Sequence, residues 1–459
     1  MYERKERHKN SYYPAFFCMD LDIPEPIGNM LRMPMDERAE ALFLHEYIHY
    51  LQDITTVSGY ARIETIVDQI KWAVMLGKQH HKLAIPLNPK STWAFNMTPN
   101  ATCLELSMGD FKKKYQNADV RYQSPEDFEV MEHSTPFKNG RNNRVKIITR
   151  FTFKDDNEVI HHYDIGEMAI SESMAYIIEQ HIYPGVLPVA PDFPYNVVRN
   201  VVRWKCQRAE TDEILVAICD VCLMYSFPGY AFYYLIEWLH QYQGPVTPAL
   251  IYLYGFGPEM IKWSNTKFWK ESLKEVNTLA RDTVDDYFIH HYWRKTADEI
   301  GLSLKAALEY RLKNPAFLID ILRGDKIYHN GALKEAVSYM GCMAIYTDTN
   351  DVYHFPVRGV EDNNQADPDW FVCLHDFYKV LFSQEAIREV RGENFFTYSC
   401  ALKEWCKKSF RKQELPDLTS MSRNCDESPW LHVSSNELAQ CSFGRLWSTY
   451  GFNRVKIKV

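Results

Sequence analysis

Helical periodicity dominates the arrangement of apolar and polar residues along this chain. The clearest segment begins at Asp36 and reads DERAEALFLHEYIHYLQDITT, with acidic residues in its first turn and no glycine or proline before Gly59. A second helical stretch covers residues 62–76, and a third begins near Gly166 and stops at Pro184. These segments predict that helices build most of the first half of the chain.

Helical patterns also cover residues 200–345, where Pro-Gly, Gly-Pro and Asn-Pro pairs mark the breaks, and residues 369–410. Strand patterns are confined to two places. Residues 144–164 carry β-branched and aromatic residues on both sides of the polar turn 154–157, which predicts a β-hairpin, and the final RVKIKV predicts a short strand. From residue 416 the remaining pattern is loop-like. The chain is therefore expected to be mostly α with a small β element, in the α+β class.

Composition narrows the range of functions. The 459 residues are 46% hydrophobic and 24% charged, which is enough to bury one large core or several ordinary ones. Glycine is scarce at 19 residues, and neither a G-x-G-x-x-G fingerprint nor a G-x-x-x-x-G-K-[ST] phosphate loop is present, which disfavours nucleotide chemistry. The formal net charge of -8 and the shortness of the basic clusters predict no nucleic-acid partner.

Signals for export or membrane insertion are not found in the sequence. The charged start MYERKERHK has no apolar segment behind it, and the longest apolar stretch, 214–239, is interrupted by Asp220, Pro228 and Glu237. The 11 cysteines have irregular spacings, which predicts reduced thiols, and the single CxxC inside the apolar stretch predicts buried ones. We expect a cytoplasmic protein with no membrane partner.

One chemical motif, H-E-x-x-H, stands inside the clearest helix. His45 and His49 are four positions apart, so both imidazoles lie on one helical face and can converge on a single metal ion. Glu46 lies about 100° further round the helix, where its carboxylate can reach a metal-bound water without ligating the metal. This arrangement suits hydrolysis, because zinc lowers the pKa of water and Glu46 can take the proton and pass it to the leaving amine.

The motif also carries a family resemblance. HEYIHYLQDITTVSG resembles the active-site helix of the zincin metallopeptidases, and its H-E-x-x-H-x-x-x-D-x-T-x-x-x-G form resembles the thermolysin-like gluzincin branch. The resemblance implies a zincin-like core and a Zn²⁺ ion held by His45, His49 and a glutamate from a later helix. Residues 171–176, SESMAY, resemble that third-ligand helix, which implies Glu172 as the third ligand.

Several further site residues are left with alternatives. Glu64 and Glu167 are other candidates for the third ligand. The alternative for each of them is a solvated carboxylate on the face of a helix. Asp53, one turn after the motif, can accept a hydrogen bond from a ligand histidine or its neighbours and so orient the site, or it can be a surface acid at the end of the helix. The resemblance also implies a Tyr or His donor to the oxyanion, and Tyr230 is the first candidate because its segment weakly resembles the substrate segment of thimet-type oligopeptidases. His240 is the second, and core packing is the alternative for Tyr230.

These inferences predict three regions and one activity. Residues 1–245 would form the zincin-like metallopeptidase region with an insertion at about 77–165, residues 246–415 an additional helical region, and residues 416–459 a loop-rich segment. The predicted activity is zinc-dependent cleavage of an intracellular protein or peptide, with a selective toxin or defence effector as one form of it. The alternative is a non-catalytic helical interaction or regulatory protein with a structural zinc site.

Overall fold

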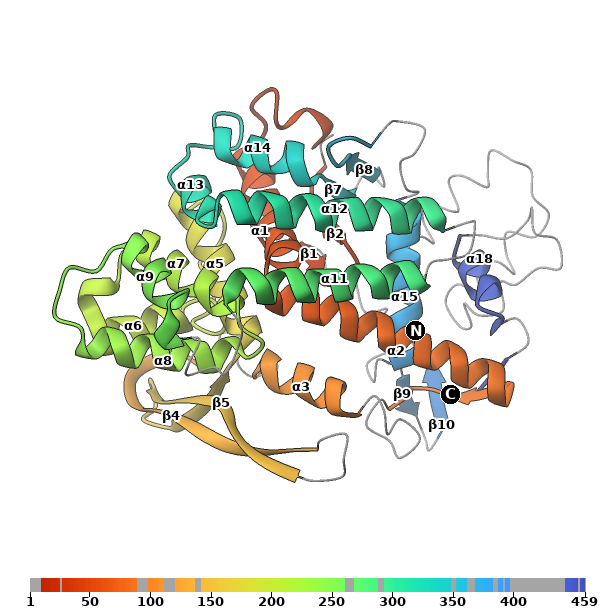
Figure 1. The fold of residues 1–459 in the computed structure, drawn as a ribbon, viewed down its shortest axis with the longest axis horizontal. Coiled ribbons are helices and arrows are strands. Elements are labelled where there is room, and N and C mark those ends of the chain that lie inside the picture. Colours follow the sequence, from red (N-terminus) through yellow and green to blue (C-terminus); the bar gives the residue numbers. More distant parts are fainter. Residues whose placement is uncertain are drawn as a thin grey trace.

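Helices surround a few small sheets in the computed structural model of this chain (Figure 1). The structure describes residues 10–24, 27–88, 98–110, 120–136, 142–260, 268–287, 293–347, 352–360, 368–382, 387–390, 393–396, 442–452 and 455–458. Within these residues the fold is mostly helical with small sheets, as the sequence predicts. No helix among them combines the length and apolarity needed to cross a membrane.

Helices account for most of the described residues. They are α1 (Glu37–Thr55), α2 (Val57–His80), α3 (Thr98–Met108), α5 (Glu167–Ile182), α6 (Val197–Cys206), α7 (Asp212–Leu223), α8 (Pro228–Gln241), α9 (Pro248–Gly255), α11 (Trp269–Tyr287), α12 (Arg294–Lys313), α13 (Phe317–Leu322), α14 (Gly331–Met340), α15 (Asp369–Phe382) and α18 (Ser442–Thr449). In Figure 1, α2, α11 and α12 lie side by side, while α6 to α9 gather around α5.

Within the described residues, the strands form four separate sheets. They are β1 (Ser11–Tyr13), β2 (Cys18–Leu21), β3 (Lys82–Ala84), β4 (Tyr122–Pro136), β5 (Asn142–Asp155), β6 (Ile160–Ile165), β7 (Cys342–Thr347), β8 (Val352–Phe355), β9 (Ile387–Val390), β10 (Glu393–Phe396) and β11 (Lys456–Lys458). The order is β1-β2-β7-β8 in a mixed sheet and β4-β5-β6 in an antiparallel one. The remaining pairs are β9 with β10 and β3 with β11.

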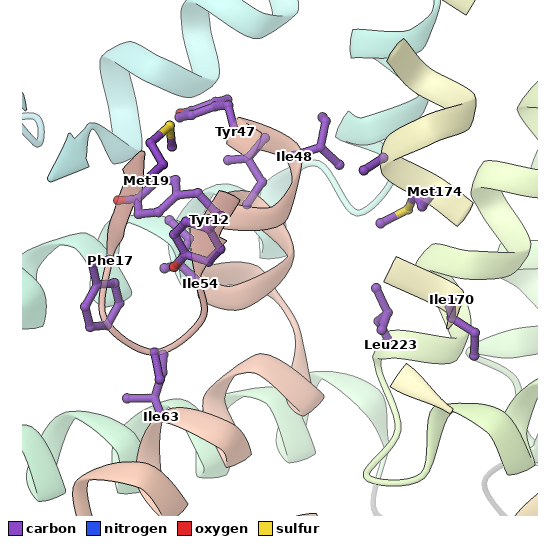
Figure 2. Packing of buried hydrophobic residues seen from close by; sticks show 14 of the residues in the cluster. Tyr12, Phe17, Met19, Tyr47, Ile48, Ile54, Ile63, Ile170, Met174 and Leu223 are labelled. Atoms are coloured by element: carbon purple, nitrogen blue, oxygen red, sulfur yellow. The ribbon is translucent and has the colours of Figure 1, made fainter. Parts of the chain in front are cut away.

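The central element is α1. Fifteen of its 19 residues are buried, because α2, α5, α12 and the strands β1 and β2 all pack against it. Figure 2 shows Ile48 of α1 on the side turned toward α5, where Met174 lies, and Tyr12 of β1 close to the same helix. A helix covered on several sides is held by its neighbours more than by its own propensity, so the orientation of its side chains is set by packing.

The start of α5 is a crowded crossing of three backbone segments. A Cβ on Gly166 would lie 2.4 Å from the amide nitrogen of Gly109, and a Cβ on Gly229 would lie 2.0 Å from the carbonyl oxygen of Ile165. Only glycine permits such close approach of one backbone to another. This glycine-poor chain thus places three glycines where the end of α3, the end of β6 and the start of α8 fix the position of α5.

Most of the elements predicted from the sequence are present. The segment from Asp36 forms α1, the stretch at 62–76 lies inside the longer α2, and the helix near Gly166 is α5. The hairpin at 144–164 is formed by β5 and β6, and the terminal strand is β11. The apolar stretch that contains the CxxC forms the buried α7 and much of α8.

Several predictions for the second half of the chain are wrong. Residues 387–390 and 393–396, predicted as helix, form the antiparallel pair β9 and β10, although Ile387 and Val390 stand at helical spacing in the sequence. Residues 442–449, predicted as loop, form α18, which buries Phe443, Leu446 and Trp447 at helical spacing. Residues 397–410, and the loop-like segment as far as 441, lie outside the described residues.

Strand pairing over long distances in sequence accounts for other elements that local patterns do not predict. β2 pairs in parallel with β7, more than 300 residues later, so the predicted regions 1–245 and 246–415 share one sheet. β4 extends the predicted hairpin into a three-stranded sheet and carries Pro125 and several acids, which are poor local strand signals. The seven cysteines within the described part of the chain are all free.

The turn between α1 and α2 yields a test of packing. A Cβ on Gly59 would lie 2.1 Å from the carbonyl oxygen of Asp53, so Gly59→Ala forces two backbone segments apart and should lower the free energy of unfolding by about 2–4 kcal/mol. Gly301, within α12, has open space where a Cβ would lie, so Gly301→Ala should raise it by about 0.5–1 kcal/mol. Urea unfolding followed by circular dichroism measures both shifts, and equal shifts would contradict this account.

Candidate metal centre

Three side chains from two helices meet in one place. His45 and His49 lie on α1, and Glu172 lies on α5, which packs directly against α1. The Nε2 atoms of the two histidines are 3.3 Å apart, and Glu172 Oε2 is 3.5 Å from His45 Nε2 and 3.3 Å from His49 Nε2. Their ligand atoms are close enough together to hold one metal ion. The structure thus brings together the three residues predicted as ligands.

Each histidine ring is held by a second hydrogen bond on its far side. Nδ1 of His45 lies 3.2 Å from Glu179 Oε2, and Nδ1 of His49 lies 2.8 Å from Gln52 Oε1. The amide of Gln52 also donates to the carbonyl of Ser171 at 2.9 Å, which ties α1 to the backbone beside Glu172. With Nδ1–H donated to an oxygen, Nε2 keeps a lone pair for a metal, and the ring orientation is fixed.

These outer partners are not found by the sequence motif. Glu179 follows Glu172 by two helical turns, so it could have been placed on the same face of α5 from spacing alone. Gln52 follows His49 by three residues on α1, which is also a neighbouring position on a helix. Neither spacing shows that the residue binds a histidine, because that depends on how closely α1 and α5 pack.

The carboxylate of Glu46 is anchored at one oxygen. The backbone amide of Tyr12, in the edge strand β1, donates to Glu46 Oε2 at 2.6 Å. Glu46 is buried, and burial raises its pKa, while the neighbouring His45 and His49 oppose that rise. A carboxylate with a raised pKa is a better proton acceptor, and the anchored oxygen fixes the direction of the other one.

Charge coupling among the ligands is strong. Burial alone would lower the pKa of His45, but its hydrogen bonds to the carboxylates of Glu172 and Glu179 outweigh burial and raise the pKa to about 10. Burial alone would raise the pKa of Glu172, but the charge of His49 and the hydrogen bonds from both histidines hold it well below its usual range. A divalent cation would replace these protons as the positive charge of the group.

The other two candidates for the third ligand lie elsewhere. Glu167 forms an ion pair with Arg62 at 3.1 Å, and Glu64 lines a separate cavity between α2 and α3. The Glu167 carboxylate is therefore paired with Arg62, and the Glu64 carboxylate lies outside the group formed by Glu172 and the two histidines. Within the described residues, that group is the one whose His, Cys, Asp or Glu atoms lie close enough for a shared metal ion.

Asp53 belongs to a buried network beside the site. It is fully buried and accepts hydrogen bonds from the Tyr12 hydroxyl at 2.8 Å, the Ala15 amide at 2.6 Å and the Arg62 guanidinium at 3.0 and 3.2 Å. These bonds attach the segment around β1 to α1. Because the backbone amide of Tyr12 also binds Glu46, Asp53 is connected to the site through strand β1. The sequence predicted either a hydrogen bond from a ligand histidine or its neighbours, or a surface position, and the buried Asp53 excludes the surface position.

A tyrosine that the sequence did not single out lies beside the group. The ring centroid of Tyr195 is 6.2 Å from that of His45 and 5.6 Å from that of Tyr176. The negative charge of Glu172 and then burial raise the pKa of Tyr195, so its hydroxyl stays protonated. It lies in the connection between α5 and α6, where no helical or strand periodicity marks it.

The predicted oxyanion donors have other neighbours. Tyr230 lies in the first turn of α8 and its ring packs edge-on against Tyr234, with centroids 5.2 Å apart. His240 is exposed at the end of α8 and its Nδ1 lies 2.8 Å from the carbonyl oxygen of Lys205. Tyr195, by contrast, has its ring beside that of His45.

Comparison with models of known families, with characterised proteins and with solved structures gives no match.

The ligand set can be tested by metal analysis. The native chain should contain about one equivalent of metal. His45→Ala, His49→Ala and Glu172→Ala should each lose this metal, because each substitution removes a side chain that binds it directly. Glu46→Gln, Glu64→Gln and Glu167→Gln should retain the metal. Elemental analysis after exhaustive dialysis measures this, and retention of metal in Glu172→Ala would exclude Glu172 as a ligand.

Metal affinity should also depend on pH. Ligation needs the neutral imidazole of His45, whose pKa is about 10, so binding at neutral pH must displace a proton. The affinity should therefore rise about tenfold per pH unit from pH 7 to pH 9 and level off above pH 10. Competition with a chromophoric chelator measures this slope. Glu179→Gln removes one of the carboxylates that raise the pKa of His45, so the pH above which the affinity becomes constant should be lower in this variant. A metal affinity that does not change with pH would contradict the assignment of His45 as a ligand.

Proposed function

We propose that this chain is a zinc metallopeptidase that hydrolyses peptide bonds in a protein or peptide substrate. The observation that carries the proposal is the convergence of His45, His49 and Glu172 with the carboxylate of Glu46 beside them. The H-E-x-x-H motif and its gluzincin-like extension agree with this arrangement, since that resemblance implies a glutamate from a later helix as third ligand. A zincin-like core around α1 and α5 is part of the same proposal.

Zinc is favoured over other metals by the donor set and its spacing. Two imidazoles and one carboxylate form a common ligand set of catalytic zinc. Zinc–ligand bonds of about 2.0–2.1 Å in a tetrahedron place ligand atoms roughly 3.3 Å apart. The three separations among His45, His49 and Glu172 are 3.3, 3.3 and 3.5 Å. Three protein ligands leave a fourth position for water or substrate, whereas structural sites usually have four.

In the proposed reaction the bound zinc would activate a water molecule and polarise the scissile carbonyl. Glu46, anchored at Oε2 by the Tyr12 amide, would accept a proton from the attacking water at Oε1 and would later donate it to the leaving amine nitrogen. Tyr195 stays protonated beside Glu172 and can donate a hydrogen bond to the carbonyl oxygen as negative charge develops there. Glu179 and Gln52 hold the two imidazoles throughout.

The experiment that tests this proposal compares cleavage by the native chain with cleavage by Glu46→Gln. The amide keeps the shape of the carboxylate but cannot accept the proton, so cleavage should fall by a factor of about 10² to 10⁴ while the metal content stays the same. Quantitative comparison of protein termini in cells that express each form identifies the cleaved proteins. Identical terminal profiles would contradict peptidase activity and favour the non-catalytic alternative with a structural zinc site.

Two phenylalanine variants refine the same experiment. Once a substrate is identified, Tyr195→Phe should lower kcat with little change in KM, because the hydrogen bond strengthens only as charge develops. Tyr230→Phe is the matched control, since its ring packs against Tyr234 on α8. If Tyr230→Phe alone lowered kcat, the oxyanion donor would be Tyr230.

A further inference from the structure

A groove lies along the last nine residues of α2, at the end of the helix that lies away from α1 in Figure 1. It has a volume of about 390 Å³, which is within the usual range of small-molecule sites. Six of the nine described residues that line it are apolar, and Lys82 adds a positive charge. This chemistry differs from that of the candidate metal centre, which is built from histidines and carboxylates.

Both walls of the groove are held by neighbouring elements. On α2, the largely buried ring of Trp72 stacks on Phe382 of α15, with ring centroids 6.3 Å apart. On the other side β3 pairs with β11, and the backbone amide of Leu87 donates to the carbonyl of Leu381 at 2.6 Å. The groove is therefore formed before a ligand arrives, which lowers the entropic cost of binding.

Apolar side chains line the groove from both walls. Trp72 and Leu76 are one turn apart on α2, and Pro86 and Leu87 lie in the segment that follows β3. Between Trp72 and His80, which also lines the groove, the helix rises about 12 Å, so there is room for an extended chain of about ten carbons. Each methylene group buried there should raise the affinity by a factor of about four.

Lys82 is the source of positive charge in this lining. It is the first residue of β3, its side chain is exposed, and none of the described residues forms an ion pair with it. A lysine ammonium donates up to three hydrogen bonds and accepts none, so it complements a carboxylate. Lys78, in the last turn of α2, is also exposed but does not line the groove.

We propose that this groove binds a carboxylic acid with an unbranched apolar chain, as in medium-chain fatty acids. The chain lies against Trp72, Leu76 and Leu87, and Lys82 binds the carboxylate. A ligand with several negative charges fits less well, because the apolar lining would remove water from charges that it cannot pair. The site lies outside the candidate metal centre and does not depend on the proposed peptidase activity.

Calorimetric titration of the full chain with decanoate, below its critical micelle concentration, tests the site. Decanoate should bind with a stoichiometry of one, and octanoate, which is two methylene groups shorter, should bind about tenfold more weakly. Decanamide has the same chain without the charge and should bind about three- to tenfold more weakly than decanoate. Absence of saturable binding, or decanamide binding as tight as that of decanoate, would overturn the proposal.

Two lysine variants test the role assigned to Lys82. Lys82→Gln should weaken decanoate binding about three- to tenfold and leave decanamide binding unchanged, because it removes the charged partner of the carboxylate alone. Lys78→Gln is the matched control, since it removes the same charge four residues earlier, outside the groove, and it should change the affinity less than twofold. Equal weakening of decanoate binding by the two substitutions would contradict the proposed site.

Two further variants locate the bound chain. Ala84 is exposed and lines the groove, so Ala84→Trp should fill it and abolish the binding of decanoate and decanamide while the circular dichroism spectrum is retained. A bromine at the chain end quenches a tryptophan that it touches, so 10-bromodecanoate should quench the fluorescence of the native chain, and Trp72→Phe should lose that quenching. Undiminished binding in Ala84→Trp, or undiminished quenching in Trp72→Phe, would place the chain elsewhere and overturn the proposal.

A carboxylate can also bind a metal ion directly, so the decanoate titration is repeated with Glu172→Ala. The affinity should be unchanged, because the groove lies outside the candidate metal centre. Loss of decanoate binding in Glu172→Ala would assign the ligand to the metal centre and contradict a separate site.

Discussion

The packing of α5 against α1 is the contact on which the candidate site depends. α1 supplies two imidazoles and a carboxylate, and α5 brings the third candidate ligand, Glu172, within 3.5 Å of both rings. Gln52 links the two helices through the His49 ring and the Ser171 carbonyl, and Glu179 reaches back to His45. A shift of about 1 Å between the helices would remove the shared position for a metal.

Buried charge explains why the surroundings of the site are so fully hydrogen bonded. Asp53, Arg62 and Glu167 are all buried, and a buried charge without partners costs several kcal/mol. Their mutual ion pairs, together with the Tyr12 hydroxyl and the Ala15 amide, offset that cost. Arg62 keeps its charge because the carboxylates of Glu167 and Asp53 outweigh the effect of burial on its pKa. The network also holds β1 against α1 and so positions Glu46.

Local sequence patterns predicted the elements whose signals are contiguous. α1 has acids at its start and apolar residues throughout, and its i, i+4 histidine spacing needs no knowledge of the fold. The strands β2 and β7 pair across more than 300 residues, and such pairing leaves no local trace. Glu64, Glu167 and Glu172 are all glutamates on helices, and of these three it is Glu172 that the fold places beside His45 and His49.

The identity of the chemical groups in the site was thus available from the chain alone: two imidazoles one turn apart, a carboxylate beside them, and glutamates on the following helices. Tertiary packing determines which of these glutamates lies beside the two histidines. The distance between a side chain on α1 and one on α5 depends on how the two helices pack, and that packing involves residues far apart in the sequence. Tyr195 shows this most clearly. It lies in an irregular connection without periodicity, and its position beside His45 follows only from the fold of the segment after α5.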